Sequence, residues 1–422
     1  MGLLNNGKVI IGYDLGNEFS QISYGRFDSG EAETLSQVAG TENYNIPTVL
    51  CKRAGVNQWF YGKEALRYEA EQQGILVDNL LTLALDGEPV LIDGESLDPV
   101  ALLTLFVKRS LGMLSQVAAF DKIGALMVTC KELNPRVLEV LGRMAAGLHL
   151  KTDRIAFQSY MEGYYHYMLY QPVELLACQS VLLTRGEDCI RTYRMECNRR
   201  TTPVVVFIEE NEFPFPKQNG DGGEINEEES DNELLRIARE LCEGQQVGSA
   251  FLIGDGFEQE WMKESLRYFC RKCRVFQGNN LFSKGAVFGM RERLGVGDAG
   301  KEYVFLSKDK LKANIGMDIL RQGEESYLAL LDAGVNWYEA AVETEFYLQD
   351  GNEIQVTITP LTGRNGKCAG IVLEDLPPGI TRLLGRFYME AENILAVRIE
   401  DEGFGEIRPA TGKVWQETIE IF

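Results

Sequence analysis

The sequence predicts an α/β domain followed by an all-β domain, and three observations support this division. Up to about residue 300, apolar strand-like runs alternate with amphipathic helical patterns, which is typical of an α/β domain with buried sheet strands. A glycine-bearing segment from Arg293 to Lys301 then interrupts both patterns. Alternating runs separated by glycine-bearing turns follow it, as in a β-sandwich. We therefore expect one domain at 1–300 and a second at 301–422.

The first element is a predicted hairpin from Val9 to Tyr24. An apolar run is broken by Asp14 and Gly16, and an alternating run follows almost at once. Gly16 permits a backbone shape that other residues resist, and the N–H groups of such a turn can face an anion. Asp14 is placed to hold a hydrated metal ion beside that anion. Taken alone, this stretch fits an ordinary sheet turn with no ligand better than a phosphate site.

The rest of the first half alternates between strands and helices. Short strands are expected around Pro47, and apolar residues have helical spacing from Lys63 to Leu85. Asp98-Pro99 and Asn134-Pro135 each place a capping residue before a proline, which predicts the start of a helix. Ile123 to Cys130 is apolar and predicts a buried strand between these helices. The tyrosines between Tyr160 and Tyr170 have helical spacing, which favours packing against neighbouring helices over a ligand cage.

Further strands and helices are expected up to the domain boundary. Val204–Ile208 predicts a strand, and Pro214–Asn232 predicts a loop. The acids from Asp221 to Glu233 do not follow a calcium-loop order, so we interpret them as a solvated charge run. Ser249–Phe257 is an apolar strand that runs into a glycine turn, and helical spacing follows from Glu258 to Cys273. Beyond the boundary, the strand-like runs are Val342–Leu348, Glu353–Thr359, Ala369–Leu373, Leu384–Met389, Ile394–Ile399 and Val414–Ile421.

Four blocks in the first domain carry a family resemblance through their order and spacing. They are the Val9–Tyr24 hairpin, Ile46–Val49 with Tyr61–Ala65, Ser249–Phe257, and Gly285–Met290. Together they resemble the nucleotide-binding domain of the DnaK-type, seventy-kilodalton heat-shock chaperones, members of the actin-like ATPase superfamily. The second domain is similar to the family's β-sandwich peptide-binding domain at Asn314–Gly316, Ile371–Gly379, Asn393–Val397 and Ala410–Lys413. No helical lid is covered, because the sequence stops at Phe422.

The resemblance implies an actin-like ATPase fold of two duplicated, ribonuclease H-like halves, at about 1–178 and 179–300. The duplication implies a second phosphate hairpin, and Ser180–Tyr193 is the candidate, with Gly186 on Gly16 and Thr184 on Asp14. The implied cofactor is ATP or ADP with magnesium, and Asp14 is the candidate metal ligand. The alternative is that no cofactor binds. The implied cofactor-binding residues are Asp14, Gly16, Asn17, Glu18, Gly186, Gly254, Asp255, Gly256 and Gly285.

Several groups that the family uses for catalysis are replaced here. Asn17 and Glu18 stand where the family has small hydroxyl residues, and Thr184 replaces its metal-facing acid. Glu187 and Asp188 stand where glycines approach the phosphates, Gln158 aligns with the catalytic Glu, and no lysine matches the catalytic one. A carboxylate about 4 Å from a phosphate charge costs roughly 1 kcal/mol in water and about 4 at intermediate dielectric. Because phosphoryl transfer depends on positioned cations, we expect a pseudo-ATPase.

Composition excludes several other classes of protein. The net charge of −21 argues against a nucleic-acid partner, and no apolar run is long enough to span a membrane. The first eight residues are too short and polar for a secretory signal, and nine scattered cysteines suit a cytoplasmic protein. Cys270 and Cys273 form one C-x-x-C without a second pair, which argues against zinc. With only His149 and His166, a histidine metal site or a Ser-His-Asp triad is hard to assemble.

The leading hypothesis is a chaperone-like binding or scaffold protein whose sandwich holds a peptide or protein partner. On this hypothesis the α/β domain is structural or a degraded nucleotide sensor, and the protein is not an enzyme. The alternative is an active ATPase or a sugar-kinase-like enzyme that uses Asp14 with a rearranged metal site. A third reading is an assembly subunit, since actin-like folds can polymerise.

Overall fold

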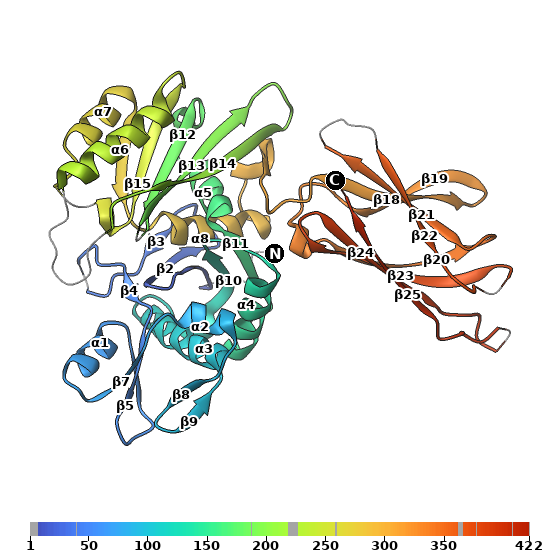
Figure 1. The fold of residues 1–422 in the computed structure, drawn as a ribbon, viewed down its shortest axis with the longest axis horizontal. Helices are drawn as coiled ribbons and strands as arrows, with labels where there is room; N and C mark the ends of the chain where they lie inside the picture. The colour runs from blue at the N-terminus through green and yellow to red at the C-terminus, as the bar shows by residue number, and fades with distance from the viewer. Residues whose placement is uncertain are drawn as a thin grey trace. The chain divides into compact units, whose positions relative to one another are not determined.

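The computed structural model describes residues 7–421 except 39, 187, 218–226, 258–259, 362–365, 377 and 407. The chain divides into two compact units, Met1–Val304 and Phe305–Phe422 (Figure 1). The boundary expected at residue 300 falls within the short 3-10 helix η5 (Ala299–Glu302). No described helix combines the length and the apolar character that crossing a membrane requires.

Unit 1 contains two sheets whose strands follow the same order. The first sheet has the order β11-β10-β1-β2-β3, with β4 also on β2, and the second contains β16-β15-β12-β13-β14. In each sheet a hairpin supplies antiparallel neighbours, and two parallel strands follow on the other side. The strands are β1 (Val9–Leu15), β2 (Phe19–Arg26), β3 (Glu33–Thr34), β4 (Ile46–Pro47), β10 (Ile123–Cys130), β11 (Ile155–Ser159), β12 (Gln179–Arg185), β13 (Cys189–Asn198), β14 (Val204–Pro214), β15 (Val247–Ile253), β16 (Arg274–Gly278) and β17 (Tyr303–Leu306).

Among the described residues unit 1 has eight α-helices, and the sequence explains where several of them begin. Every residue of β1 and β10 is buried, as central strands covered on both faces require. The side chains of Asp98 and Asn134 accept from Val100 N and Val137 N, so both expected N-caps are confirmed. The helices are α1 (Gly62–Ala70), α2 (Leu80–Asp86), α3 (Pro99–Ser110), α4 (Pro135–Leu148), α5 (Tyr160–Leu169), α6 (Glu227–Cys242), α7 (Glu264–Lys272) and α8 (Leu281–Arg293), with 3-10 helices η1 (Leu111–Gln116), η2 (Phe120–Lys122), η3 (Val173–Leu176) and η4 (Asp255–Phe257).

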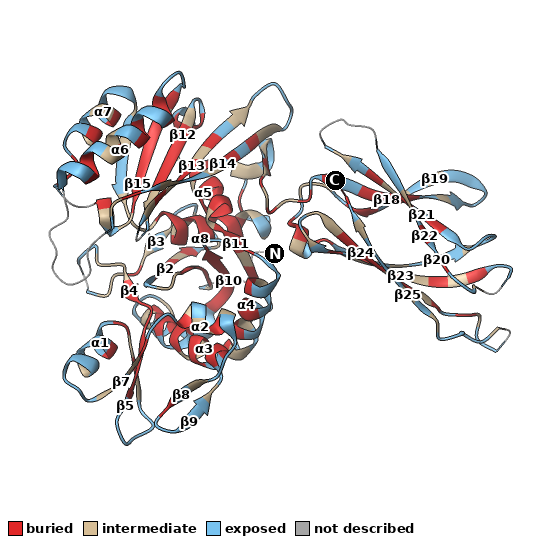
Figure 2. Cartoon of the chain, in the orientation of Figure 1, coloured by how far each residue is buried: buried red, intermediate tan, exposed pale blue. Residues whose placement is uncertain are grey.

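Helices α5 and α8 cross at the centre of unit 1, where Figure 2 shows both largely buried. A Cβ on Gly285 of α8 would lie 2.1 Å from Gly163 O of α5, so the two backbones touch at this crossing. Stacked rings flank it, Tyr160 on Phe282 at 3.8 Å and Tyr170 on Phe288 at 4.1 Å between centroids. The tyrosine run therefore packs between helices, as its spacing predicted.

The prediction of one continuous helix from Lys63 to Leu85 is wrong. Helix α1 ends at Ala70, strand β7 (Gly74–Val77) follows, and α2 starts at Leu80. Strand β7 pairs with β5 (Leu50–Arg53), which also pairs with β6 (Trp59–Tyr61). A Cβ on Gly74 would lie 2.6 Å from Lys52 O, so this pairing depends on the glycine. A separate hairpin joins β8 (Val90–Ile92) and β9 (Glu95–Leu97).

The second half departs from its predicted loop and helix. Strand β14 extends to Pro214 and α6 already begins at Glu227, so the loop expected through Asn232 is too long. Buried Asp231 accepts hydrogen bonds from the N–H groups of Glu264 (2.8 Å) and Ser265 (3.0 Å), which caps α7. Asp231 is thus no part of a solvated charge run, and residues 221–226 of that run lie outside the described residues. Helix α7 begins at Glu264 and not at 258, because this capping defines its start.

Unit 2 consists of two four-stranded antiparallel sheets, ordered β19-β18-β21-β22 and β20-β23-β24-β25. All six expected runs correspond to strands, whereas β18 and β19 were not among them. Strand β18 contains Gly316, over which the ring of Tyr327 lies, and this glycine obscured its pattern. The strands are β18 (Ala313–Arg321), β19 (Glu324–Leu331), β20 (Ala341–Leu348), β21 (Glu353–Pro360), β22 (Lys367–Val372), β23 (Thr381–Ala391), β24 (Ile394–Asp401) and β25 (Val414–Glu420), with one 3-10 helix, η6 (Trp337–Glu339).

Candidate functional site

The two hairpins of unit 1 match residue for residue. In the first turn Gly16 N donates to Phe19 O at 3.1 Å, and in the second Gly186 N donates to Cys189 O at 2.8 Å. Asp14 pairs with Gln21 across the first hairpin, and Thr184 pairs with Arg191 across the second. Thr184 therefore takes the place of Asp14, as the alignment predicted, and Arg191 takes the place of Gln21.

Gly16 is required for space and not for an unusual backbone angle. Its φ lies outside the left-handed region, contrary to our expectation. A Cβ at this position would lie 2.6 Å from Phe19 O, the acceptor that closes the turn. The turn is therefore tight because its own carbonyl occupies the volume that a side chain would need.

Asp14 lies at the end of β1 and is buried. Its Oδ1 accepts a hydrogen bond from the Tyr160 hydroxyl at 2.8 Å, and the Tyr160 ring is held by stacking on Phe282. Burial raises the pKa of Asp14 to about 7, although the Tyr160 hydrogen bond lowers it in part. The carboxyl therefore keeps its proton to a higher pH than an exposed aspartate does, and one of its oxygens already accepts a hydrogen bond.

Asn17 and Glu18, at the tip of the first hairpin, have separate roles. Asn17 Oδ1 accepts from Thr82 N at 3.0 Å and its Nδ2 donates to Thr82 Oγ1 at 2.8 Å, which ties the turn to α2. The Glu18 side chain is exposed, and its backbone carbonyl accepts from Thr48 N at 2.9 Å. In this exposed position its repulsion of a phosphate corresponds to the aqueous value of roughly 1 kcal/mol.

The second hairpin carries an arginine beside its glycine. The Arg185 guanidinium carbon lies 4.9 Å from the Phe215 ring centroid and 5.4 Å from that of Trp261. Burial lowers the pKa of this guanidinium from its ordinary value. A Cβ on Gly256 would lie 2.4 Å from Arg185 Cδ, so Gly256 makes room for this side chain. We expected Gly256 to approach a nucleotide, and the structure places Arg185 there.

Two acids were expected to crowd the phosphates beside Gly186. The Asp188 side chain is exposed and lies 3.9 Å from Lys217 Nζ, at the edge of ion-pair distance. Glu187 lies outside the described residues.

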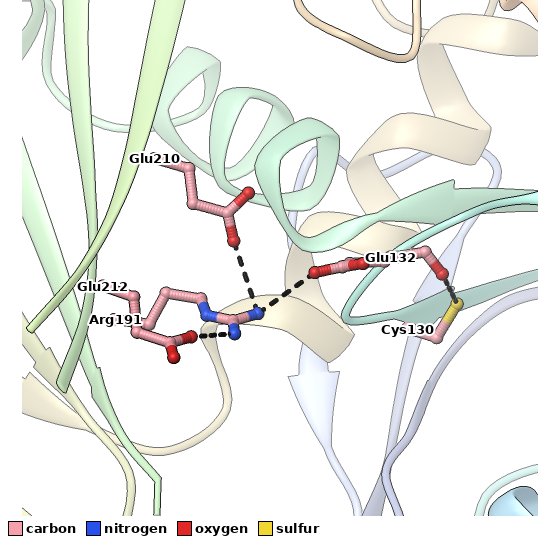
Figure 3. Close-up of polar contacts among 5 residues, drawn as sticks. All are labelled: Cys130, Glu132, Arg191, Glu210 and Glu212. Carbon is pink, nitrogen blue, oxygen red and sulfur yellow. Dashed lines mark hydrogen bonds and ion pairs between the residues drawn. The ribbon is translucent and has the colours of Figure 1, made fainter. Parts of the chain in front are cut away.

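Arg191 lies between carboxylates that come from both sheets (Figure 3). Its guanidinium pairs with Glu210 at 3.4 Å and also with Glu212, both on β14 of the second sheet. It also reaches Glu132 at 3.3 Å, in the segment that follows β10 of the first sheet. The Arg191 side chain is only 12% exposed, but Glu132 is 48% exposed, so solvent still screens the ion pair between them in part. One fixed cation thereby joins the two halves of unit 1.

Asn45 makes a second bridge between the halves. Its Nδ2 donates to both carboxylate oxygens of Asp255 at 2.7 Å, and its Oδ1 accepts from Gln21 Nε2 at 2.5 Å. Gln21 belongs to the first hairpin, whereas Asp255 follows β15 of the second sheet. Asp255, which we expected to contact a nucleotide, is therefore engaged by Asn45.

The side chains or Cα atoms of the remaining predicted residues take no part in the Asn45 and Arg191 contacts. Gly254 has φ +110° and open space where a Cβ would project. Of the predicted binding residues Gly254, Gly256 and Gly285, it is the one that no neighbouring atom covers. Gly285 is covered by Gly163 at the helix crossing. Gln158 is fully buried, and a Cβ on Gly289 would lie 2.3 Å from its Oε1. Gln158 thus faces α8 and not the hairpins.

These residues fit a magnesium-bound triphosphate poorly. Magnesium requires ionised or neutral oxygen ligands in near-octahedral geometry. Asp14 is the only carboxylate on the matched hairpin pairs, and its Oδ1 already accepts a hydrogen bond from Tyr160. The opposing hairpin has Thr184 at the position of Asp14, and the cation Arg191 lies across from it at the position of Gln21. Among the described residues no group of three or more His, Cys, Asp or Glu side chains could hold a metal ion.

Sequence reasoning missed the residues that join the halves. Tyr160 was expected only to pack, while Glu132, Arg191 and Asn45 were not considered. Arg191 could have been found by extending the hairpin alignment along the second strand, where it replaces Gln21. Glu132 and Asn45 gave no such signal, since both lie in connecting segments and meet their partners only in the folded chain.

Comparison with known families places the chain without assigning an activity. A domain of unknown function, DUF8552, matches residues 310–421, which is most of unit 2. No curated protein matches the chain. The C-terminal model of a family of unknown function, DUF5716, matches residues 31–308, which is more than half of the sequence. The chain therefore belongs to the DUF5716 family.

Proposed function

We propose that this protein is a cytoplasmic, chaperone-like scaffold whose α/β unit has an actin-like architecture but acts as a nucleotide-independent frame. Its β-sandwich holds a peptide or protein partner. The observation that carries the proposal is the position of Arg191, whose guanidinium contacts Glu132 on one side and Glu210 and Glu212 on the other. A cation that is part of the chain joins the two halves.

The actin-like architecture is supported by the repeated strand order and the matched hairpins. Both sheets of unit 1 place a hairpin beside two parallel strands, which an internal duplication would produce. Each hairpin closes with the same glycine N–H to carbonyl hydrogen bond. The motif resemblance to the chaperone family adds the order of the glycine-bearing blocks along the chain.

Nucleotide independence follows from the chemistry of the bridge. An arginine guanidinium stays charged at any physiological pH and presents several donors to carboxylates. Arg191 can therefore hold the halves together without a bound ligand, and the fork from Asn45 to Asp255 adds a second contact. In an ATPase of this kind, a metal and a triphosphate would supply such contacts, and hydrolysis would remove them.

Partner binding is assigned to the sandwich because unit 2 presents sheet edges and exposed apolar side chains. Each of its two sheets ends in strands with one unpaired backbone edge among the described strands, and such edges bind extended peptides. Exposed apolar residues on these strands and their connections include Leu320, Tyr347, Val372 and Val414.

Calorimetric titration of the full chain with Mg-ATP and Mg-ADP tests the frame hypothesis. We expect no binding heat in the micromolar range and no phosphate release. A second measurement attaches fluorophores to the two halves of unit 1 and follows energy transfer, which should not respond to nucleotide. Micromolar binding with turnover that disappears in Asp14→Asn would establish the active enzyme instead.

A nucleotide sensor without turnover is the second candidate. It is favoured by Gly254, which remains open, and by the first hairpin, which keeps its glycine turn and Asp14. It predicts a binding heat that weakens in Asp14→Asn, together with a change in energy transfer and no phosphate release. The same two measurements therefore separate frame, sensor and enzyme.

A further inference from the structure

A pocket of about 500 Å³ lies at the amino ends of the parallel strands β1, β10 and β11 in the first sheet. Its lining consists of Lys8 just before β1, Gly124 in β10, and the segment from Leu150 to Arg154 that leads from α4 into β11. The turn that follows Asp14 lies at the other end of β1. The pocket is therefore separate from the candidate site at the hairpins.

Three of the lining side chains are cations, in a chain whose net charge is −21. They are Lys8, Lys151 and Arg154, and Asp153 is the one acid among the described lining residues. None of the three cations forms an ion pair with a described residue. With three positive charges against one negative, the lining carries a net charge of +2. We call it the basic pocket.

Hydrogen bonds fix the segment that carries two of these cations. Thr152 Oγ1 donates to Gly124 O at 2.8 Å and accepts from Arg154 N at 3.2 Å. Leu126 N donates to Arg154 O at 2.9 Å, which attaches the segment to β10. Lys8 packs against the same strand, since a Cβ on Gly124 would lie 3.1 Å from Lys8 Cβ. The three cations are therefore carried by a backbone that is held in place without a ligand.

A purely structural role explains only part of this arrangement. Helix α4 ends at Leu148, and a helix C-terminus is stabilised by a nearby cation. This effect falls off within one turn, so it accounts for Lys151 and not for Lys8, which precedes β1. Like charges that line one pocket repel one another, and a bound anion offsets this cost.

We propose that the basic pocket binds a phosphate monoester, carried either by a small molecule or by a phosphorylated side chain. Such a group has a charge of about −1.5 to −2 at pH 7, which matches the net charge of the lining. The Arg154 guanidinium suits bidentate hydrogen bonding to phosphate oxygens, and the two lysines act as point charges. A volume of about 500 Å³ also leaves room for the group that bears the phosphate. The site does not depend on the function proposed for the β-sandwich.

Calorimetric titration of the full chain with three matched probes tests the charge requirement. The probes are N-acetyl phosphoserine amide, N-acetyl aspartate amide with one negative charge, and N-acetyl serine amide with none. We expect submillimolar binding of the phosphoserine probe, binding of the aspartate probe that is weaker by about fivefold or more, and no binding of the serine probe. Aspartate that binds as tightly as phosphoserine would overturn the proposal, as would phosphoserine that fails to bind at millimolar concentration.

Two substitutions test the named cations. Arg154→Gln and Lys8→Gln should each weaken phosphoserine binding about fivefold or more, because each removes a charged donor. Arg271→Gln changes the net charge equally at an exposed position on α7 and should leave binding unchanged. The Arg154 side chain is also exposed, so we expect this variant to fold, as circular dichroism would verify. Equal losses in Arg154→Gln and Arg271→Gln would mean unspecific attraction and overturn the proposal.

A phosphoserine peptide with alanines on both sides distinguishes the two sources of the phosphate. Peptide binding that is tighter than that of the amide probe by about tenfold or more would support a phosphorylated protein segment as the ligand. Equal affinities would support a small phosphorylated molecule, since the flanking chain then adds no contact. A peptide that does not bind, while the amide probe does, would likewise support the small molecule.

Discussion

The first and second hairpins of unit 1 have the same backbone geometry, but the first presents an acid and the second presents a base. In the first, Asp14 faces Gln21 across the strands, whereas in the second Thr184 faces Arg191. The turns themselves are alike, since each glycine N–H donates to the carbonyl three residues ahead. A glycine and the pairing register of the strands therefore preserve the turn geometry. The side chains beside the turn differ in chemistry between the two hairpins. A matching backbone is therefore weak evidence for a matching activity.

The helices that cover the hairpins differ as well. Helix α8 reaches the backbone of the first sheet because Gly12 and Gly25 leave no side chain in its way. At the matching positions of the second hairpin, Leu182 and Met195 are buried. A substitution at a glycine contact adds atoms and causes a clash, whereas truncation of a packed side chain removes atoms and leaves a cavity.

The largest expected effect comes from Gly12→Ala. The added Cβ would lie 2.1 Å from Ser283 O and 2.7 Å from Val287 N, and these backbone atoms cannot move without shifting α8. We expect a loss of about 3–5 kcal/mol in the free energy of unfolding, measured by urea denaturation. Gly142→Ala in α4 has open space and is the control, with an expected gain of up to about 1 kcal/mol.

The matching change in the second hairpin, Leu182→Ala, should cost about 2–5 kcal/mol by leaving a cavity. A Gly12→Ala variant as stable as the wild type would show that α8 does not contact the first sheet through this glycine.

The next prediction distinguishes Asp14 from Thr184 by the pH dependence of the free energy of unfolding. The folded chain holds a proton on Asp14 up to about pH 7, whereas the unfolded chain releases it near the ordinary value of 3.8. The folded state therefore binds more protons in this window, and Asp14 lowers stability as pH rises from about 4 to 7. Asp14→Asn should raise the unfolding free energy by something of the order of 3 kcal/mol at about pH 8, with little change at about pH 4.

Thr184→Val is the matched control for this profile, because it removes no titrating group. Unfolding free energies from urea melts across the pH range provide the measurement. An Asp14→Asn profile parallel to that of the wild type would mean that the carboxyl is not buried as described.

A smaller effect compares the two turn glycines. In Gly16→Ala the new Cβ meets Phe19 O at 2.6 Å, a backbone atom that closes the turn. In Gly186→Ala it meets Cys189 Sγ at 3.0 Å, a side chain that can rotate. We expect thermal denaturation to show Gly16→Ala as less stable by about 1–3 kcal/mol, with Gly186→Ala changed by less than about 1 kcal/mol. Equal losses would show that the two turns are held equally tightly.

The smallest effect tests the ion pair between Arg191 and Glu132. A double-mutant cycle with Arg191→Met and Glu132→Gln should give a coupling of about 0.5–1 kcal/mol that falls at high salt, because Glu132 is half exposed. The pair Lys217 and Asp188, at 3.9 Å with both side chains largely exposed, is the control and should give a coupling near zero. A zero coupling for Arg191 and Glu132 would remove the main support for a frame that is independent of nucleotide.

Many of the elements follow from local sequence signals. Asp98-Pro99 and Asn134-Pro135 specify helix starts through side-chain caps, and the alternating runs after residue 340 specify strands. The predictions failed where distant partners decided the outcome. Strand β7 interrupts an expected helix because it pairs with β5, and α7 starts late because Asp231 caps it from another helix.

For the candidate site, the sequence alone determined the two glycine turns, the exchange of Asp14 for Thr184 and the acidic balance of the chain. It could not decide what occupies the space between the hairpins. Tyr160, Asn45, Glu132 and Arg191 are far apart in the chain, and only the folded sheets bring them to Asp14, Asp255 and one another. The physical reason is that hydrogen bonds and ion pairs act over a few ångströms, so the tertiary structure selects these partners while local sequence sets only the turns.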